Sequence, residues 1–181
     1  MALCDYLITS DIAGYNCASP AVKGAESMGL LINRSDIGTC TISNFSVTLT
    51  LSCGRKVAYK VYQSGKQPFN GTQQEMVEGT YVNTLTNTVQ FVILKQDNVT
   101  AEEIFALANG EFVAVIPDKQ GNYQVYGAEA GLKCSAAVRE LYNDDTLAGW
   151  LITLTEEGAT RSLFTTSSNF NTLQQMTAVC Q

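Results

Sequence analysis

The chain has 181 residues, a length that fits one domain or one domain with a substantial arm. Its hydrophobic content of 45% is sufficient for a packed core, while charged residues, at 15%, fall below the usual share of about 25%. The formal net charge of -6 argues against a general nucleic-acid binder or a binder of anionic membranes, because both need an excess of Lys and Arg.

Histidine is absent from the sequence. This absence removes Ser-His-Asp and Cys-His catalysis, zinc sites built from imidazole, and the commonest general base near neutral pH. No two cysteines have the C-x-x-C spacing, which disfavours a tetrathiolate zinc site and thioredoxin-like redox chemistry. The six cysteines are Cys4, Cys17, Cys40, Cys53, Cys134 and Cys180. We therefore expect no metal, no cofactor and no catalytic residue.

The first residues lack the basic and apolar regions of a signal peptide. No run approaches the ~18 apolar residues that a membrane-spanning helix needs. We expect reduced thiols in a cytoplasmic environment and no contact with a membrane.

Two regions differ in pattern. Residues 1–39 have weak periodicity and predict an N-terminal arm or long connection that enters a strand near Met28–Asn33. Residues 40–181 predict a single β-rich domain. Residues 63–79 within it predict an extended loop, a kind of segment that is usually functional or contact-forming. Its apolar residues, Phe69 and Met76, either pack back onto the sheet or reach a neighbouring subunit.

Apolar and polar residues alternate strictly from Phe45 to Cys53, which predicts a half-buried strand. Alternation resumes from Val57 to Val61, and we expect the two runs to form a hairpin. Residues 80–86 and 88–95 predict two further strands. The apolar run at 91–94 indicates that the second of these is covered on both faces.

A short helix is predicted next. Thr100 and Glu103 match the capping box at its start, and Asn109-Gly110 suits its end. Glu102 and Glu103 favour the positive end of the helix dipole. They do not form a catalytic acid pair, because adjacent residues on a helix point about 100° apart.

A strand at Phe112–Ile116, ended by Pro117, and a strand at Tyr123–Tyr126 are joined by a predicted turn at Asp118–Asn122. The two strands and the turn together predict a hairpin.

Ala136–Leu141 predicts a second short helix. Asn143-Asp144-Asp145 lacks the spacing of a calcium loop and is interpreted as a turn. Trp150 begins an alternating strand, Glu156-Glu157-Gly158 predicts a turn, and residues 159–165 predict the returning strand of a hairpin. A polar link follows, and Leu173 to Val179 closes the chain with weak patterning. The fold class is mainly β, an antiparallel β-sandwich or barrel with one short flanking α-helix.

An enzyme is the first function class to consider. Among the enzyme classes considered, only a glycosidase with a pair of catalytic carboxylates is compatible with the residue types present. The acids available to it are Asp118, Glu129, Asp144 and Glu157. Surface acids of any β domain would give the same set, so we expect no enzymatic activity.

A carbohydrate-binding β-sandwich module is the second class, and it needs exposed aromatic side chains. The candidates by residue type are Tyr59, Tyr62, Tyr81, Tyr123 and Tyr126. Packing in the core and across strands explains the same residues equally well.

A structural subunit of a symmetric assembly is the third class. Low charge, hydroxyl-rich strands, an apolar arm and a long loop all suit a protein whose surface is mostly interface.

The order of motifs also carries a resemblance. A T-x-E-E helix, LANG, QVYG and the segment D-D-T-x-x-GW-x-ITL-x-E follow one another, and VKGAESMGLLINRSDI and KVYQSGKQPF precede them. In this order the chain resembles virion structural proteins of tailed phages and prophages of Bacteroides-type gut bacteria. A sheet with one flanking helix is also similar to tail-tube proteins, which stack as rings around a DNA channel.

The resemblance implies a ring or tube component of the tail or head–tail region, with DNA passing through. Its partners would be copies of itself and neighbouring virion proteins, without specific nucleic-acid binding. It would be assembled in the bacterial cytoplasm and located in the virion. A capsid-decorating protein of the same virion would share nearly every one of these features.

Overall fold

The computed structural model describes residues 24–52, 58–94, 98–139 and 149–175, and the structural findings concern these residues. They form one sheet of eleven strands and two α-helices. The strands are β1 (Met28–Asn33), β2 (Ile37–Ser43), β3 (Ser46–Leu51), β4 (Tyr59–Tyr62), β5 (Gln73–Val77), β6 (Thr84–Ile93), β7 (Glu111–Pro117), β8 (Tyr123–Tyr126), β9 (Leu132–Arg139), β10 (Trp150–Ala159) and β11 (Leu163–Thr165). The helices are α1 (Asn98–Asn109) and α2 (Ser167–Gln175).

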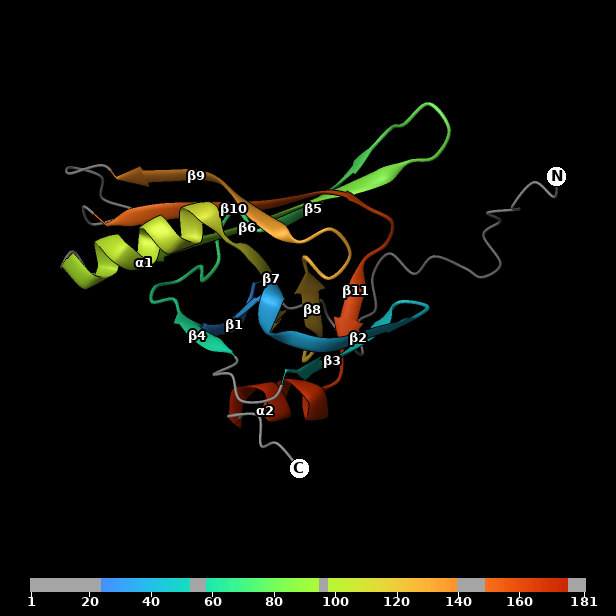
Figure 1. Ribbon diagram of the computed structural model, residues 1–181, viewed down its shortest axis with the longest axis horizontal. Coiled ribbons are helices and arrows are strands. Elements are labelled where there is room, and N and C mark those ends of the chain that lie inside the picture. The colour runs from blue at the N-terminus through green and yellow to red at the C-terminus, as the bar shows by residue number, and fades with distance from the viewer. Residues whose placement is uncertain (1–23, 53–57, 95–97, 140–148, 176–181) are drawn as a thin grey trace, which may run out of the picture.

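The strand order is β2-β3-β11-β8-β7-β9-β10-β6-β5, and β1 pairs with both β7 and β4. All pairings are antiparallel except that between β11 and β3. The prediction of a mainly β, mainly antiparallel fold is confirmed, and the sheet does not close into a barrel. The long strands β6, β9 and β10 cross one side of the molecule, β2 and β3 lie on the other, and β1, β7 and β8 lie between them (Figure 1).

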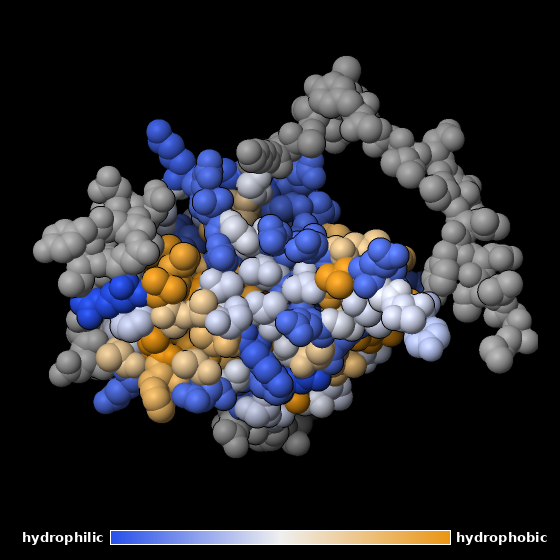
Figure 2. All heavy atoms as spheres, turned by 90° about the horizontal axis from the view of Figure 1, so that it is seen from above, coloured by the Kyte–Doolittle hydropathy of each residue, from blue (hydrophilic) through white to orange (hydrophobic). Residues whose placement is uncertain are grey.

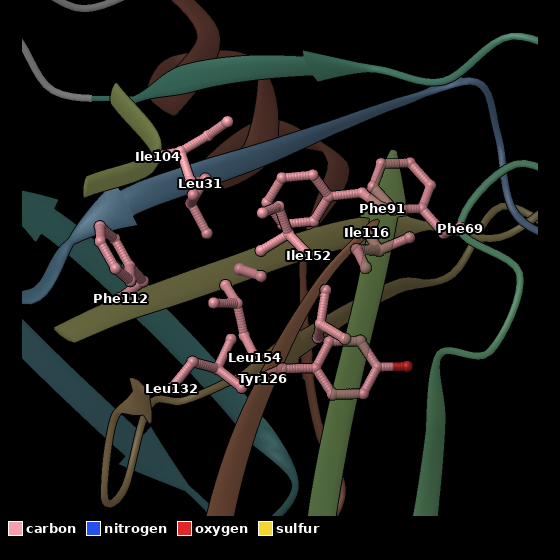
Figure 3. Close-up of a cluster of buried hydrophobic side chains, with 12 residues drawn as sticks. Leu31, Phe69, Phe91, Ile104, Phe112, Ile116, Tyr126, Leu132, Ile152 and Leu154 are labelled. Carbon is pink, nitrogen blue, oxygen red and sulfur yellow. The ribbon is translucent and has the colours of Figure 1, made fainter. Parts of the chain in front are cut away.

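The strands β1 and β7 separate two hydrophobic cores. Leu31 and Ala114 face the first core, whereas Ile32 and Val113 face the second. This division follows from the period of two along a strand, which sends successive side chains to opposite faces. The first core lies between β7 and β8 on one side and β6, β9, β10 and α1 on the other (Figure 3). The second lies between β1 and β7 and the layer of β3, β11 and α2.

The predicted strand at Met28–Asn33 is confirmed, and it is an inner strand of the fold. The strand most deeply covered on both faces is β7, where every residue from Phe112 to Pro117 is buried. The run at 91–94 is covered less than predicted, because Val92 and Ile93 are only half-buried and Leu94 is exposed.

The predicted pairing of the 45–53 run with the 57–61 run is wrong. β3 forms its hairpin with β2 through the two-residue turn Asn44-Phe45, in which Asn44 has a φ of 54°. Asn is one of the few residues that tolerate this left-handed conformation. The two edges of β3 are taken by β2 and β11, so β4 pairs with β1 instead.

Two predictions on residues 63–95 are corrected. The second half of the predicted loop is the strand β5, which pairs with β6 from Gln73↔Thr88 to Val77↔Thr84. The two predicted strands at 80–86 and 88–95 are one strand, β6, of ten residues. Asn87 does not interrupt it because its side chain is buried in a hydrogen bond with Glu156.

The helix α1 begins at Asn98, so Thr100 lies within the helix and is not its N-cap. Its predicted end at Asn109-Gly110 is confirmed. Ile104 is the buried member of its apolar stripe and joins the first core. The hairpin of β7 and β8 is also confirmed, with Asp118 accepting hydrogen bonds from the backbone N–H groups of Gln120 and Asn122 in the turn.

The C-terminal third departs further from prediction. Residues 136–139 belong to the strand β9 rather than to a helix, because β10 pairs with them. Gly158, with a φ of 80°, lies in a bulge of β10 instead of a hairpin turn. β11 pairs with β8 and β3, not with β10. Residues 167–175, read as a polar link and a weakly patterned end, form α2, whose Phe170 and Leu173 are buried.

Candidate functional site

The hairpin of β5 and β6 ends in a tip that extends away from the body of the sheet (Figure 1). Six residues, Glu78–Asn83, connect the last paired residues Val77 and Thr84. We call residues 75–84 the hairpin arm. Gly79 permits its tight connection, because a Cβ there would lie 2.2 Å from the carbonyl oxygen of Val82.

Apolar side chains of the hairpin arm face solvent. The exposed fraction is 69% for Met76, 96% for Tyr81 and 62% for Val82. Residues 67–94 contain no Lys or Arg, and Glu75 and Glu78 are their only charged residues. The arm is therefore an apolar surface with negative charge. Exposed apolar patches on a folded protein mark interaction sites more often than isolated apolar residues do.

Beyond the end of β5, two side chains take the place of a neighbouring strand along β6. The Thr72 hydroxyl accepts a hydrogen bond of 3.1 Å from the Gln90 N–H. The buried Gln63 side chain accepts one of 2.8 Å from the Val92 N–H and donates one of 3.0 Å to the Val92 carbonyl oxygen. These contacts satisfy backbone groups that an edge strand would leave unpaired.

A groove of about 1510 Å³ lies at this end of β6. One wall is β4 with residues 63–67, the base includes residues 90–94, and the opposite wall is α1 with Phe112. The groove is larger than the ~300–1,000 Å³ of most small-molecule sites. Its size suits a polypeptide segment better than a small ligand.

Exposed aromatic side chains and positive charge line one wall of the groove. Tyr59 and Tyr62 are exposed on β4, and Lys60 and Lys66 are the basic residues of the lining. Glu103 on α1 is its one acidic residue. Apolar residues also gather on the surface at the end of the molecule where α1 and β9 lie (Figure 2). The exposed apolar residues of this region include Leu94, Phe105 and Val138.

Two of the four candidate carboxylates, Asp118 and Glu129, hold nearby residues through hydrogen bonds. Asp118 accepts the hydrogen bonds of its own turn, including one of 2.9 Å from the Asn122 side chain. Glu129 accepts from the Thr160 hydroxyl and forms an ion pair with Arg161. Asp118 and Glu129 lie at opposite ends of β8, and Glu157 is exposed on β10. Asp144 lies outside the described residues, as does the whole of the predicted turn at 143–145.

Glu156 is the carboxylate that sequence reasoning missed. It is 2% exposed and accepts hydrogen bonds of 2.7 Å from Asn87 Nδ2, 2.7 Å from the Gly127 N–H and 2.8 Å from the Ala130 N–H. Its position in a presumed E-E-G turn gave no signal of burial. The three hydrogen bonds that it accepts join β6, β10 and the 127–130 segment. The role of Glu156 is therefore structural.

The tyrosine candidates divide into two groups. Tyr59, Tyr62 and Tyr81 are exposed, whereas Tyr126 is buried in the first core and Tyr123 packs on Phe170 with ring centroids 4.8 Å apart. Burial, with a further contribution from the charge of Asp118, raises the pKa of Tyr126 to about 12.

The thiols and acids of the described segments give no metal centre. In these segments no three Cys, Asp or Glu side chains gather as metal ligands would. Cys40 and Cys134 are free thiols, and partial burial raises the pKa of both. The other four cysteines lie outside the described residues. No helix in the described part of the chain has the length and apolarity to cross a membrane.

No family model, curated protein or solved structure matches this chain. The hairpin arm and the groove are the two surfaces of this fold that suit contact with another molecule.

Proposed function

We propose that this chain is a structural subunit of a phage virion, forming a ring or tube in the tail or head–tail region through contacts between copies. The observation that supports self-assembly most directly is the hairpin arm, which exposes Met76, Val77, Tyr81 and Val82 next to one another along the chain. Burying such a surface against another subunit would release it from water at about 25 cal/mol per Å² of apolar area.

The acidic balance of the chain fits the proposed passage of DNA. A lumen with a net negative charge repels the phosphate backbone, so DNA slides past without binding. The assignment to a virion comes from the order of sequence motifs, and the arm supplies the contact surface that such a subunit needs.

The test is the mass of the purified protein in solution, measured by light scattering, together with electron micrographs of any particle. We expect rings or tubes from the natural sequence. The double variant Met76→Ser/Tyr81→Ser should remain folded but monomeric, because both side chains are exposed in the single chain. The matched control is Phe105→Ser, an exposed aromatic residue on α1 that belongs neither to the hairpin arm nor to the groove lining and should leave assembly intact.

A natural-sequence protein that stays monomeric at all concentrations would overturn the proposal. Binding of that monomer to a glycan array would instead support a carbohydrate-binding module, for which Tyr59 and Tyr62 on the groove wall are the available aromatic residues.

A further inference from the structure

We propose that the hairpin arm of one copy docks into the groove of a second copy, so that subunits join head to tail. The inference rests on the proposed function, because it names the partner of the hairpin arm within the assembly. It assigns the hairpin arm and the groove to the two sides of a single contact.

The charges of the two surfaces are complementary. The arm carries Glu75 and Glu78 among apolar side chains and has no basic residue. The groove lining carries Lys60 and Lys66, with exposed tyrosines, against a single acid, Glu103. Opposite charges that meet at an interface fix its register and select the correct partner. The apolar residues of the arm would then contact Tyr59, Tyr62 and the α1 wall.

The free strand edges of β4 and β5 also fit the proposed contact between the hairpin arm and the groove. Within the described strands, β4 pairs only with β1, and β5 pairs only with β6. Each therefore keeps one edge free of strand partners, β4 on the groove wall and β5 at the base of the arm. Strand addition along such an edge is a common mode of protein association, because main-chain hydrogen bonds supply affinity and side chains supply specificity.

The geometry requires two copies. The arm leaves β6 at Thr84, whereas the groove is lined by residues 90–94 at the other end of the same strand. A strand of ten residues spans about 30 Å, so an arm does not reach the groove of its own chain. A contact between two different surfaces is heterologous, and repeating it generates a ring if the rotation closes or a filament if it does not.

The experiment uses charge reversal on each surface. The groove variant is Lys60→Glu/Lys66→Glu, and the arm variant is Glu75→Lys/Glu78→Lys. Each alone should raise the concentration needed for assembly by about tenfold or more, because like charges then face each other. The two variants mixed in equal amounts should assemble again, since each acidic surface then finds a basic one. Lys119→Glu and Glu26→Lys, exposed charges outside both surfaces, are the matched controls.

A second measurement reports the contact directly. A photoreactive amino acid in place of Val82 should form crosslinks between copies to residues 59–67 or to the groove-lining residues Glu103, Ala106 and Leu107 of α1, located by mass spectrometry. This readout works on small oligomers as well as on complete particles.

The outcomes separate the two proposals. Assembly that persists in both charge variants, or crosslinks from position 82 to other surfaces, would overturn the head-to-tail docking and leave the assembly proposal standing. Loss of assembly in both variants without recovery in the mixture would also contradict the docking. A natural-sequence protein that never assembles would overturn both proposals.

Discussion

Asn87 and Glu156 lie opposite each other on β6 and β10, and the Asn87 Nδ2 atom donates a buried hydrogen bond of 2.7 Å to Glu156 Oε2. The same carboxylate also accepts the N–H groups of Gly127 and Ala130. Three chain segments distant in sequence thus share one buried carboxyl group. A buried donor left without its partner carries the full cost of desolvation.

Glu156→Ala should therefore lower the free energy of unfolding by about 3 kcal/mol or more, because three donors lose their acceptor. Glu156→Gln should have an intermediate effect, since its amide group supplies one acceptor oxygen and places N–H groups against donors. Urea unfolding measures both. Glu157→Ala, one residue away and exposed, is the control and should change stability by no more than about 0.5 kcal/mol. Equal midpoints for the alanine variants at 156 and 157 would contradict this role.

The raised pKa of Tyr126 predicts that the free energy of unfolding depends on pH in the alkaline range. Its pKa of about 12 in the folded protein lies above the ordinary value near 10. Between these values the unfolded chain releases the proton that the folded protein retains, so the free energy of unfolding falls as pH rises. The contribution is complete below pH ~10, and its loss through pH ~12 amounts to about 2 kcal/mol.

Urea unfolding across this pH range should show the decline in the natural sequence. Tyr126→Phe should remove this part of the slope, while Tyr62→Phe, at an exposed position, should retain it. A Tyr126→Phe protein with the same pH slope as the natural sequence would show that another group titrates.

Phe69 decides between the two interpretations of the 63–79 segment. It is 5% exposed, and a Cβ added at Gly29 would lie 2.9 Å from its ring, so the ring packs against β1. Phe69→Ala should destabilise the fold by about 3–5 kcal/mol. Phe105→Ala, at a residue 74% exposed, should have an effect within about 0.5 kcal/mol. Thermal and urea unfolding of the pair measure the difference, and a Phe69→Ala protein as stable as its control would contradict the core assignment.

Asn169 attaches α2 to the sheet. Its Nδ2 donates a hydrogen bond of 2.9 Å to the Leu49 carbonyl oxygen, and its Oδ1 accepts one of 3.3 Å from the Leu49 N–H. A neighbouring strand would make the same two kinds of contact. Asn169→Ala should lower the free energy of unfolding by about 1–3 kcal/mol and speed hydrogen exchange at the Leu49 amide. Asn171→Ala, exposed on the same helix, should leave that amide protected. Unchanged exchange at Leu49 in the first variant would show that α2 is held by Phe170 and Leu173 alone.

The sequence predicts correctly those elements whose conformation depends only on residues close together in the chain. The alternation around Val47 and Leu49 gave β3, the Asp118–Asn122 turn gave the β7–β8 hairpin, and Asn109-Gly110 gave the end of α1. Hydrophobic period and turn chemistry act between residues close in sequence, so they are visible without the fold.

Which strands pair with each other could not be predicted from the sequence in the same way. β3 joins β2 rather than β4, and residues 136–139 form a strand because β10 offers them an edge, although Ala favours helix. The candidate surfaces show the same division. Phe69 and Met76 belong to one predicted loop, yet the first lies in the core and the second on the hairpin arm.

The amino-acid sequence by itself determined a mainly β chain of low charge, without histidine, and with its strongest local elements in place. The tertiary structure alone decided which strands pair, that Glu156 is a buried anchor, and that arm and groove lie at opposite ends of β6. The physical reason is that strand pairing and burial depend on contacts between residues far apart in sequence, whereas period, capping and turns do not.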